Sequence, residues 1–338
     1  MSAVDDEKFM RAALRAAERG VGHTSPNPAV GALIVSKGKA IATGWHRRAG
    51  LPHAEIEALK KAHFAKGATL YVTLEPCSTH GRTPPCVEAI IAAGIKRVVI
   101  GAIDPNPAHA GRAVRILKKA GITVQTGILG EECSALNNAF NKWIVSGMPW
   151  VIAKAGMSLD GRISRQPGES QWITSPASRA HAQKLRARVD AILIGAETLR
   201  ADNPHLTVRG IRGAKQPWRI VLTRSGNLPP AAHLFTDTHK DKTLVYKNKS
   251  LRAVLRDLGK KQITSVLIEG GGNVLGQAFD QKLVDEVQFY IAPLLIGGPK
   301  VSLGGLGAAS SEAGAKIKNP RYKKIGEDIL VSGEVEYP

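Results

Sequence analysis

The chain has 338 residues, of which 43% are hydrophobic and 22% are charged, and its formal net charge is +19. A chain of this length exceeds the size at which one hydrophobic core usually stops growing, so we expect two domains. No apolar run approaches the roughly 20 residues of a membrane span, and the N-terminal residues lack the pattern of a secretory signal. We therefore expect a cytoplasmic protein with no membrane partner.

The positive charge has two interpretations. Lys and Arg number 47 against 28 Asp and Glu, an excess that could serve nucleic-acid binding. The basic residues are spread over both halves without a dense tract, which favours a phosphorylated small molecule or a basic solvated surface. We expect no specific nucleic-acid partner.

The first half predicts alternating helices and strands. Residues 5–19 have the pattern of an amphipathic helix, and residues 29–45 that of a β-hairpin turning at Lys37 and Gly38. The pattern then predicts helix 53–62, strand 68–74, helix 86–94, strand 96–103, helix 111–121, strand 122–128 and a closing helix 131–147. Such alternation implies a mainly parallel sheet covered on both faces.

The pattern restarts near residues 146–149, which indicates a second α/β domain. We expect the two domains at 1–146 and 147–338. The second domain has predicted strands at 150–156, 190–196, 218–224, 243–247 and 265–271 and predicted helices at 176–189 and 252–259. Residues 296–318 are rich in Gly, Ala and Ser, so we expect a mobile loop there.

Two of the three cysteines define a candidate metal site. His53 opens a predicted helix, Cys77 follows a predicted strand, and Cys86 begins the next helix. One imidazole and two thiolates suit tetrahedral zinc and leave a fourth position for water. The helix N-terminus is expected to favour the thiolate form of Cys86, whereas Cys133 is interpreted as an inert buried cysteine.

Glu55 follows His53 by two residues, and we expect it to move protons rather than to bind the metal. Zinc lowers the pKa of bound water from about 15.7 to about 7, but the hydroxide still needs a partner for proton transfer. Glu55 would take the proton of the water and deliver it to the ring nitrogen and the departing amine.

These motifs resemble those of the zinc nucleobase deaminases, which have His-x-Glu followed by Pro-Cys-x-x-Cys. Here eight residues, STHGRTPP, separate the cysteines, and this longer loop is similar to that of the pyrimidine deaminase of riboflavin biosynthesis. TSPNPAVGALIV, GWHRRAGLPHAE, GATLYVTLEPC, GRTPPC and DPNPAHAGR resemble segments of that enzyme in the same order. The resemblance implies a zinc cofactor and a cytidine-deaminase-like three-layer α/β/α fold.

The resemblance also implies a substrate pocket, and the residues that would line it are Asn27, His46, Arg82, Asp104 and Asn106. Arg82 would pair with the ribose 5-phosphate. Asn27 and Asn106 lie among prolines, so turn formation is the alternative for both. Thr79 stands where the family often has a second histidine.

From residue 150 the chain resembles the reductase half of the bifunctional riboflavin deaminase-reductase. Matching segments include KAGMSLDGRIS, LIEGGGNVLGQAF and LVDEVQFYIAPLLIGG. The resemblance implies a dihydrofolate-reductase-like α/β fold and hydride transfer from NADPH. The implied cofactor contacts are Lys154, Gly156, Trp172, Thr198, Asp202, Gly270, Gly271, Gly272, Asn273, Val274, Leu275 and Gly276, and the implied substrate contacts are Ser170, Arg186, Leu206, Arg209 and Glu269.

Several of these contacts also have a physical interpretation of their own. The three glycines after Glu269 precede a predicted helix whose N-terminus can hold a phosphate, with a tight turn as the alternative. Arg186 and Arg209 suit a ribose phosphate, with a surface salt bridge as the alternative. Lys154 would assist the opening of the sugar ring or orient the sugar. Thr223 replaces an acid that is usual in the family.

The sequence thus predicts a bifunctional enzyme of riboflavin biosynthesis. It would deaminate 2,5-diamino-6-(5-phosphoribosylamino)pyrimidin-4-one and then reduce the ribosyl group of 5-amino-6-(5-phosphoribosylamino)uracil to ribityl. One alternative is an active deaminase with a degenerate reductase half, for which the substitution at Thr223 is a hint. Another is a nucleic-acid base deaminase, against which the STHGRTPP spacing and the reductase motifs argue. We also expect a homo-oligomer.

Overall fold

The computed structural model describes residues 3–79, 84–163 and 172–338. The chain divides into two compact units, Met1–Gly147 and Met148–Pro338. Each unit has its own sheet and its own buried core. Within the described ranges, no helix combines the length and the apolar character that crossing a lipid bilayer demands.

The described part of the first unit is built on a five-stranded sheet. Its strands are β1 Gly31–Ser36, β2 Lys39–Trp45, β3 Thr69–Leu74, β4 Arg97–Ala102 and β5 Thr123–Thr126. Their order across the sheet is β2-β1-β3-β4-β5, with β1 antiparallel to both neighbours and β3, β4 and β5 parallel. Lys37 and Gly38 turn the β1–β2 hairpin with φ of 47° and 74°, as a two-residue type I′ turn requires.

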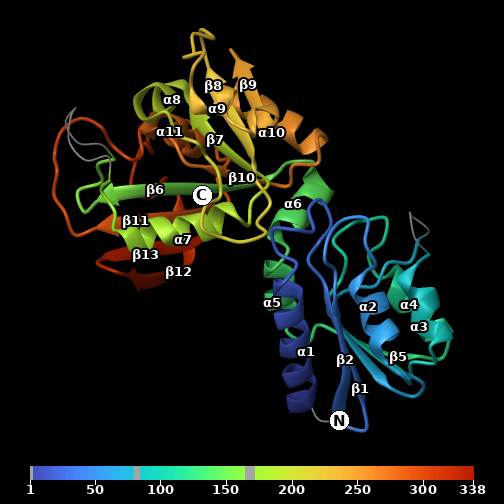
Figure 1. Cartoon of the computed structure of the whole chain (residues 1–338). Helices are drawn as coiled ribbons and strands as arrows, with labels where there is room; N and C mark the ends of the chain where they lie inside the picture. The colour runs from blue at the N-terminus through green and yellow to red at the C-terminus, as the bar shows by residue number, and fades with distance from the viewer. Residues whose placement is uncertain (1–2, 80–83, 164–171) are drawn as a thin grey trace. The chain divides into compact units, whose positions relative to one another are not determined.

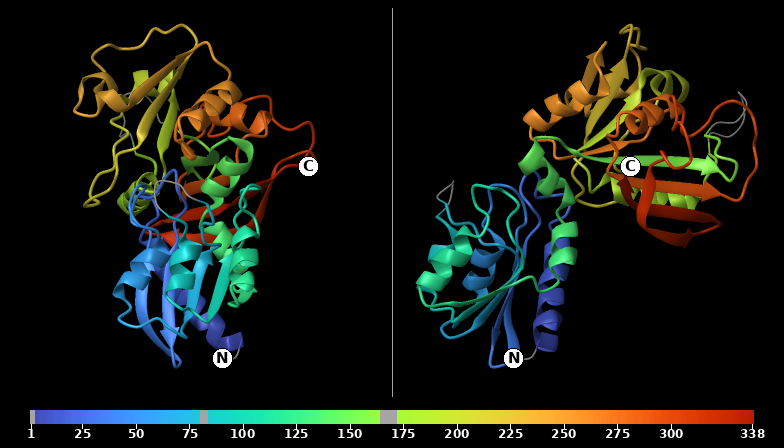
Figure 2. Two further views of the ribbon diagram at one scale, coloured as in Figure 1. Left: turned by 90° about the vertical axis from the view of Figure 1, so that its right-hand side faces the viewer. Right: turned by 180° about the vertical axis from the view of Figure 1, so that it is seen from behind.

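Helices cover both faces of this sheet and give three layers (Figures 1 and 2). They are α1 Ala3–Glu18, α2 Ala54–Lys61, α3 Cys86–Ala92, α4 Arg112–Lys119, α5 Gly130–Ala135 and α6 Asn138–Ser146. On one face, α1 and α5 bury Met10 and Cys133 against the strands. On the other, α2, α3 and α4 bury Ala58, Ile90 and Leu117. The predicted parallel strands and their covering helices are therefore confirmed in the first half.

The expected closing helix 131–147 is wrong, because α5 and α6 are separate helices. The break falls at Asn137, whose side chain is buried. Its Oδ1 accepts a hydrogen bond from the Ala29 N–H at 2.8 Å, and its Nδ2 donates to the Ala29 carbonyl at 3.0 Å. Asparagine side chains that form hydrogen bonds with backbone groups compete with the continuation of a helix. Here the backbone partner is Ala29, which is distant in sequence, so the helical pattern of the sequence did not reveal the break.

The carboxyl edge of the parallel strands gathers the functional residues of the first unit. β3 leads into Glu75 and Cys77, and β4 leads into the loop 103–111. Helix α2 begins directly after His53, and α3 begins with Cys86. Because parallel strands end at one edge, side chains from four segments meet there.

The described part of the second unit is built on an eight-stranded sheet. Its strands are β6 Trp150–Ser158, β7 Ala191–Gly195, β8 Trp218–Thr223, β9 Thr243–Lys247, β10 Ser265–Ile268, β11 Glu286–Ala292, β12 Lys316–Ile325 and β13 Asp328–Glu336. Their order is β12-β13-β11-β6-β10-β7-β8-β9. The strands from β11 to β9 run parallel, and β13 and β12 extend the sheet antiparallel. The five predicted strands β6 to β10 are confirmed, whereas the last three were not predicted.

Helices also lie against both faces of the second sheet. They are α7 Pro176–Arg186, α8 Ala196–Asp202, α9 His233–Thr236, α10 Leu251–Lys260 and α11 Gly272–Asp280, with a short 3-10 turn at Lys240–Lys242. Leu255 of α10 and Leu275 of α11 belong to one large core cluster. Leu199 of α8 and Leu234 of α9 belong to a second, and Ala182 of α7 belongs to a third, smaller one.

The expected loop 296–318 has neither helix nor strand until β12 begins, so its predicted end lies too far along the chain. Two carboxylates from outside the loop accept hydrogen bonds from its backbone N–H groups. Asp160 accepts a hydrogen bond from the Gly297 N–H at 2.7 Å, and Asp280 accepts one from the Leu306 N–H at 2.8 Å. Residues between these two anchors form part of the wall of a cavity described below.

Candidate active sites

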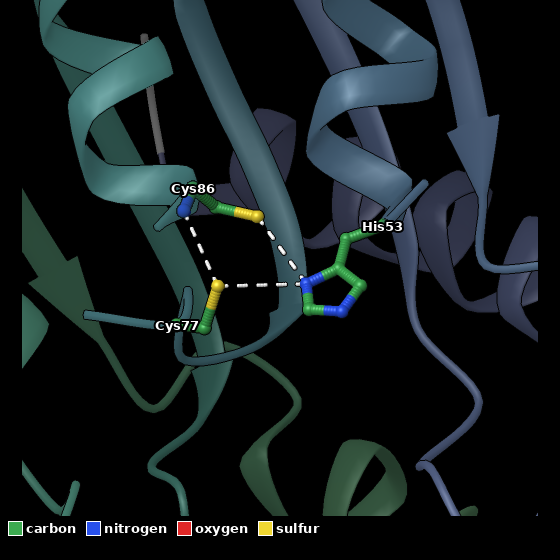
Figure 3. A group of neighbouring side chains, drawn as sticks. All are labelled: His53, Cys77 and Cys86. Carbon is green, nitrogen blue, oxygen red and sulfur yellow. Dashed lines mark hydrogen bonds between the residues drawn. The ribbon is translucent and has the colours of Figure 1, made fainter. Parts of the chain in front are cut away.

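Three side chains of the first unit converge on one point. Nδ1 of His53 lies 3.5 Å from Sγ of Cys77 and 3.4 Å from Sγ of Cys86 (Figure 3). With ordinary zinc bond lengths, tetrahedral geometry separates a nitrogen and a sulfur ligand by about 3.6 Å. All three ligand atoms lie within 4.8 Å of one another. The three residues therefore fit a zinc ion that keeps one coordination position for water.

The local fold aims these side chains at one another. His53 is the N-cap of α2 and has extended backbone angles, so its side chain leaves the helix at its first turn. Cys77 lies in the connection after β3, and Cys86 is the first residue of α3. The N–H of Cys86 donates to the Sγ of Cys77 at 3.2 Å. The N-terminus of α3 thus stabilises negative charge on the sulfur of Cys77.

In the metal-free chain, the pKa shifts of the two cysteines favour a thiolate on Cys77 before one on Cys86, whereas the expected Cys86 thiolate concerns the zinc-bound site. A hydrogen bond from the Cys86 thiol lowers the pKa of Cys77 to about 4. The same bond, together with burial, raises the pKa of Cys86. The first negative charge therefore forms on Cys77. Zinc ligands bind as thiolates, so metal binding would release the proton of Cys86.

Glu55 lies in the first turn of α2, directly beside the three ligands. Its side chain is buried, and it shares a hydrogen bond with the Cys86 thiol. Burial raises the pKa of the Glu55 carboxyl group, which brings it toward the range where a group both takes and gives protons. Among the described residues, the cluster with metal-ligand spacing is His53, Cys77 and Cys86 without Glu55.

His46 and Asn27 form a hydrogen-bonded pair next to the same site. Nδ1 of His46 lies 3.1 Å from the carbonyl oxygen of Pro52, which can only accept, so Nδ1 carries the proton. Nε2 of His46 therefore accepts a hydrogen bond from Nδ2 of Asn27 at 3.1 Å. The His46 ring also lies edge-on to the His53 ring, with the centroids 5.3 Å apart.

Asp104 and Asn106 lie on the loop after β4. Asp104 accepts a hydrogen bond from the Asn106 N–H at 2.9 Å, and Asn106 accepts one from the Ala108 N–H at 3.0 Å. Both side chains therefore shape turns, which is the alternative raised for Asn106. Burial raises the pKa of Asp104, and the negative charge of Cys77 adds to this effect, so Asp104 lies near the candidate metal site. Arg82 lies outside the described residues.

The second unit contains a cavity of about 940 Å³ between β6, α7, α8 and the start of α11. The expected contacts that line it are Lys154, Gly156, Trp172, Arg186, Thr198, Asp202, Arg209, Glu269, Gly271, Gly272, Asn273 and Leu275. Leu206 lies in the core instead, and Gly270, Val274 and Gly276 are set back from the cavity surface. Ser170 lies outside the described residues.

A buried ion pair forms part of the cavity wall. Arg186 donates to both carboxylate oxygens of Glu269 at 2.6 and 2.7 Å, and to the carbonyl of Thr207 at 3.1 Å. Burial would raise the pKa of Glu269, but the guanidinium of Arg186 lowers it to about 2. Arg186 is thus largely committed to the protein itself. The exposed side chain of Arg209 is better placed to meet a phosphate.

Lys154, Ala155 and Gly156 of β6 line the cavity. Burial lowers the pKa of the Lys154 ammonium, and the charge of Glu269 opposes this shift. Nζ of Lys154 lies 5.9 Å from the centre of the Tyr290 ring, and the Tyr290 hydroxyl pairs with Nδ1 of His181 at 2.8 Å. Tyr290 is a cavity residue that was not predicted from the sequence.

The glycines after β10 are explained in part by packing within the chain. A Cβ at Gly272 would lie 2.1 Å from the carbonyl oxygen of Val301, and a Cβ at Gly276 would lie 2.2 Å from the backbone of Gly304. The Gly304 N–H donates to the Gly272 carbonyl at 3.0 Å. Gly271 has a φ of 65°, which favours glycine. Both the tight turn and the loop packed on α11 therefore require glycine here.

The substitution at Thr223 leaves the turn after β8 well ordered. Thr223 is buried, and its Oγ1 accepts a hydrogen bond from the Gly226 N–H at 3.0 Å. The N–H of Asn248 donates to the Thr223 carbonyl at 2.8 Å. The Thr223 hydroxyl thus closes this turn.

Comparison with known proteins gives the class of the two units. The family model for the cytidine and deoxycytidylate deaminase zinc-binding region matches residues 3–102. The model for the RibD C-terminal domain matches residues 149–331. The chain therefore joins a zinc-dependent deaminase unit to a reductase unit.

Full-length relatives give the family. The riboflavin biosynthesis protein RibD of Escherichia coli is 41% identical, and the alignment covers 97% of this chain and 99% of that protein. A solved structure of RibD from Acinetobacter baumannii has a TM-score of 0.90 at 36% identity, with 99% of each chain covered. A structure from Thermotoga maritima, described as a diaminohydroxyphosphoribosylaminopyrimidine deaminase and 5-amino-6-(5-phosphoribosylamino)uracil reductase, has a TM-score of 0.90 at 35% identity and covers 99% of each chain. The chain belongs to the RibD family.

Membership of this family confirms the central expectations from the sequence. The fold joins a cytidine-deaminase-like domain to a RibD reductase domain. The chain is a bifunctional deaminase and reductase of riboflavin biosynthesis. The expected cofactors, zinc for the first unit and NADPH for the second, are those of this enzyme class.

Proposed function

We propose that residues 1–146 deaminate 2,5-diamino-6-(5-phosphoribosylamino)pyrimidin-4-one and that residues 147–338 reduce the ribosyl group of 5-amino-6-(5-phosphoribosylamino)uracil with NADPH. The observation that carries the proposal is the convergence of His53, Cys77 and Cys86 beside the buried carboxyl group of Glu55. The Thermotoga maritima relative, whose name combines both activities, supports the pairing of the two reactions in one chain.

In the first reaction, water replaces the amine on the pyrimidine ring, and ammonia leaves. His53, Cys77 and Cys86 would hold the zinc ion, which supplies the Lewis acidity that lowers the pKa of water to about 7. Glu55 accepts one proton from water and places it on the adjacent ring nitrogen. It then takes the second proton, from the hydroxyl group added to the ring carbon, and delivers it to the departing amine, which leaves as ammonia. Its buried position keeps this proton away from bulk solvent.

The neighbouring residues would orient the pyrimidine ring. The carbonyl of Pro52 fixes the tautomer of His46, and His46 in turn accepts a hydrogen bond from the amide nitrogen of Asn27. The amide oxygen of Asn27 is then free to accept a hydrogen bond from a donor on the substrate. Asp104 and Asn106 would line the other side from the loop after β4, and Arg82 would pair with the phosphate.

In the second reaction, the bond between the anomeric carbon and the ring oxygen breaks. NADPH, when bound, would supply the hydride for the carbon, and a proton would go to the oxygen. Lys154 faces the cavity with a lowered pKa, which suits a group that assists this proton transfer. The ion pair of Arg186 and Glu269 would hold the wall in place, and Arg209 would bind the phosphate of the substrate.

The glycine-rich start of α11 would contact NADPH together with residues of α8. Gly271, Gly272 and Asn273 line the cavity at the N-terminus of that helix, where backbone N–H groups favour a phosphate. Thr198 and Asp202 line it from α8. The remaining expected contacts of this run, Gly270, Val274 and Gly276, would support the backbone rather than touch the cofactor.

We also propose that the chain works in the cytoplasm as a homo-oligomer. Both cysteine ligands must stay reduced to bind zinc, and a reducing compartment keeps thiols in that state. β12 is an exposed edge strand, and edge strands are common sites of self-association. Sedimentation of the purified chain measures its oligomeric state, and a monomer at micromolar concentration would contradict this part of the proposal.

The activity is tested by incubating the zinc-loaded protein with the diaminopyrimidine, with and without NADPH, and identifying the products by mass. Without NADPH, the product should have an oxygen in place of one amine. With NADPH, the mass should rise further by a hydride and a proton. An unchanged substrate mass would refute the deaminase assignment, and deamination without any oxidation of NADPH would show a degenerate reductase half.

A further inference from the structure

Glu75 is a buried carboxylate whose role was not predicted from the sequence. It directly follows β3, and only 5% of the residue is exposed. Its two oxygens accept hydrogen bonds from four backbone N–H groups. The distances are 3.3 Å from Asp104 and 2.9 Å from Gly111 to Oε2, and 2.9 Å from Ala113 and 3.4 Å from Val114 to Oε1.

These contacts make Glu75 the cap of a helix in another segment of the chain. The N-cap residue of α4 is Gly111, which has no side chain and a φ of 71°. The free N–H groups at the start of α4 therefore need an acceptor from elsewhere. A carboxylate suits this position, because the helix dipole and charge-assisted hydrogen bonds both stabilise negative charge there.

The same carboxylate also closes the loop 103–111. Oε2 binds the N–H of Asp104 near the start of the loop and that of Gly111 at its end. Between these points, the side chains of Asp104 and Asn106 form the two turns described above. The position of the whole loop relative to β3 therefore depends on the side chain of Glu75.

Glu75 is also close in sequence to the candidate metal site, because Cys77 follows it by two residues. Both of its oxygens are occupied by backbone donors, and it is not part of the described cluster with metal-ligand spacing. A role as a zinc ligand is thus disfavoured by geometry. A rigid link between Cys77 on one side and the loop 103–111 on the other is what its contacts provide.

We propose that Glu75 is a positioning residue, which holds the loop carrying Asp104 and Asn106 at a fixed place relative to the zinc ligand Cys77. This inference rests on the proposed function, in which Asp104 and Asn106 contact the pyrimidine. It assigns to Glu75 an effect on substrate binding and none on the chemistry at the metal.

The test compares Glu75→Gln with a matched control, Asp6→Asn. A glutamine has one oxygen in place of two and turns its NH2 group against two of the four backbone N–H donors, so it cannot bind both the loop 103–111 and the start of α4. Asp6 is also a buried carboxylate of the first unit, but it binds Arg97 and Tyr71 beneath α1, on the face opposite α4. Both variants lose one buried carboxylate, and only Glu75→Gln separates the loop 103–111 from the start of α4.

For Glu75→Gln we expect KM for the diaminopyrimidine to rise about tenfold to a hundredfold, the size expected for lost charge-assisted hydrogen bonds. Its zinc content and kcat should match the wild type. Asp6→Asn should lower the melting temperature and leave KM unchanged. The reductase reaction of the second unit serves as an internal control for protein concentration in both variants.

An unchanged KM in folded Glu75→Gln would overturn the proposal. An equal rise of KM in Asp6→Asn, or loss of zinc from Glu75→Gln, would overturn it too, because the effect would then be general stability or metal binding. If Glu75→Gln does not fold, amide exchange on the wild type decides. The amides of Gly111 and Ala113 should be protected, and fast exchange would contradict the proposal. Exchange needs no substrate, so this result stands even where the wild type fails to turn over the pyrimidine.

Discussion

The two units solve different chemical problems, and their sites differ accordingly. In the first, three ligand atoms lie within 4.8 Å of one another, and one buried acid stands beside them. In the second, a cavity of about 940 Å³ is lined from several strands, helices and loops. Metal-assisted hydrolysis concentrates its work in a few groups, whereas hydride transfer depends on holding two reactants in place. Single substitutions should therefore be decisive in the first unit and graded in the second.

The largest effect is expected from removing a metal ligand. Cys86→Ser should lose bound zinc and all measurable deamination, because a neutral hydroxyl is a poor replacement for a thiolate in this site. The reductase unit should keep its rate with the deaminated substrate. Metal analysis by mass spectrometry and separate assays of the two reactions measure this. Equal loss of both activities would contradict the separation of the two chemistries.

Glu55→Gln should come next, with kcat for deamination reduced by about 10²- to 10⁴-fold, the usual contribution of a general acid and base. Zinc content should stay at the wild-type level, because Glu55 is outside the ligand cluster. Glu57→Gln is the matched control, since Glu57 lies one half-turn further along α2 and pairs with Arg47 at 3.6 Å. Full activity of Glu55→Gln would refute its role in proton transfer.

In the second unit, the largest effect should fall on stability. Arg186→Met leaves the buried carboxylate of Glu269 without its partner, which costs about 3–5 kcal/mol. Lys261→Met removes an exposed partner of Asp257 at 3.8 Å and should cost less than about 1 kcal/mol. Calorimetry of the full chain compares the two. Equal melting temperatures of the two variants would contradict the proposal of a supporting ion pair. The double variant Arg186→Met with Glu269→Gln should recover part of the lost stability.

The smallest expected effect is a shift in a pH profile. Burial lowers the pKa of Lys154, so its ammonium loses its proton at a lower pH than an exposed lysine does. If the charged form assists reduction, the rate should fall as pH rises through this lowered pKa. Lys154→Arg keeps its charge at higher pH and should move the fall upward. An identical profile in both proteins would contradict a role for the charge.

The sequence predicted that His53, Cys77 and Cys86 lie close together, because the signals that place them are local. His53 and Cys86 each stand at the start of a helix, and Cys77 stands after a strand, so spacing alone placed them at one edge of a sheet. The charge distribution between the two sulfurs was not predictable in the same way. It depends on the N–H of Cys86 pointing at Cys77, which is a matter of three-dimensional geometry.

Contacts between distant residues account for most of what the sequence did not predict. The break before α6 depends on Asn137 binding the backbone of Ala29. The pairing of Arg186 with Glu269 joins residues 83 positions apart. β12 is exposed along most of its length, so it lacks the apolar alternation that marks a strand. Its hydrogen bonds to β13 stabilise it instead.

The proposed chemistry depends most directly on the zinc site, and anomalous X-ray scattering at the zinc absorption edge tests it. A crystal of the zinc-loaded chain should show one strong peak bonded to Nδ1 of His53 and to the sulfurs of Cys77 and Cys86, with Glu55 outside the ligand set. A disulfide between the two cysteines, or a zinc peak bound at other residues, would contradict this chemistry.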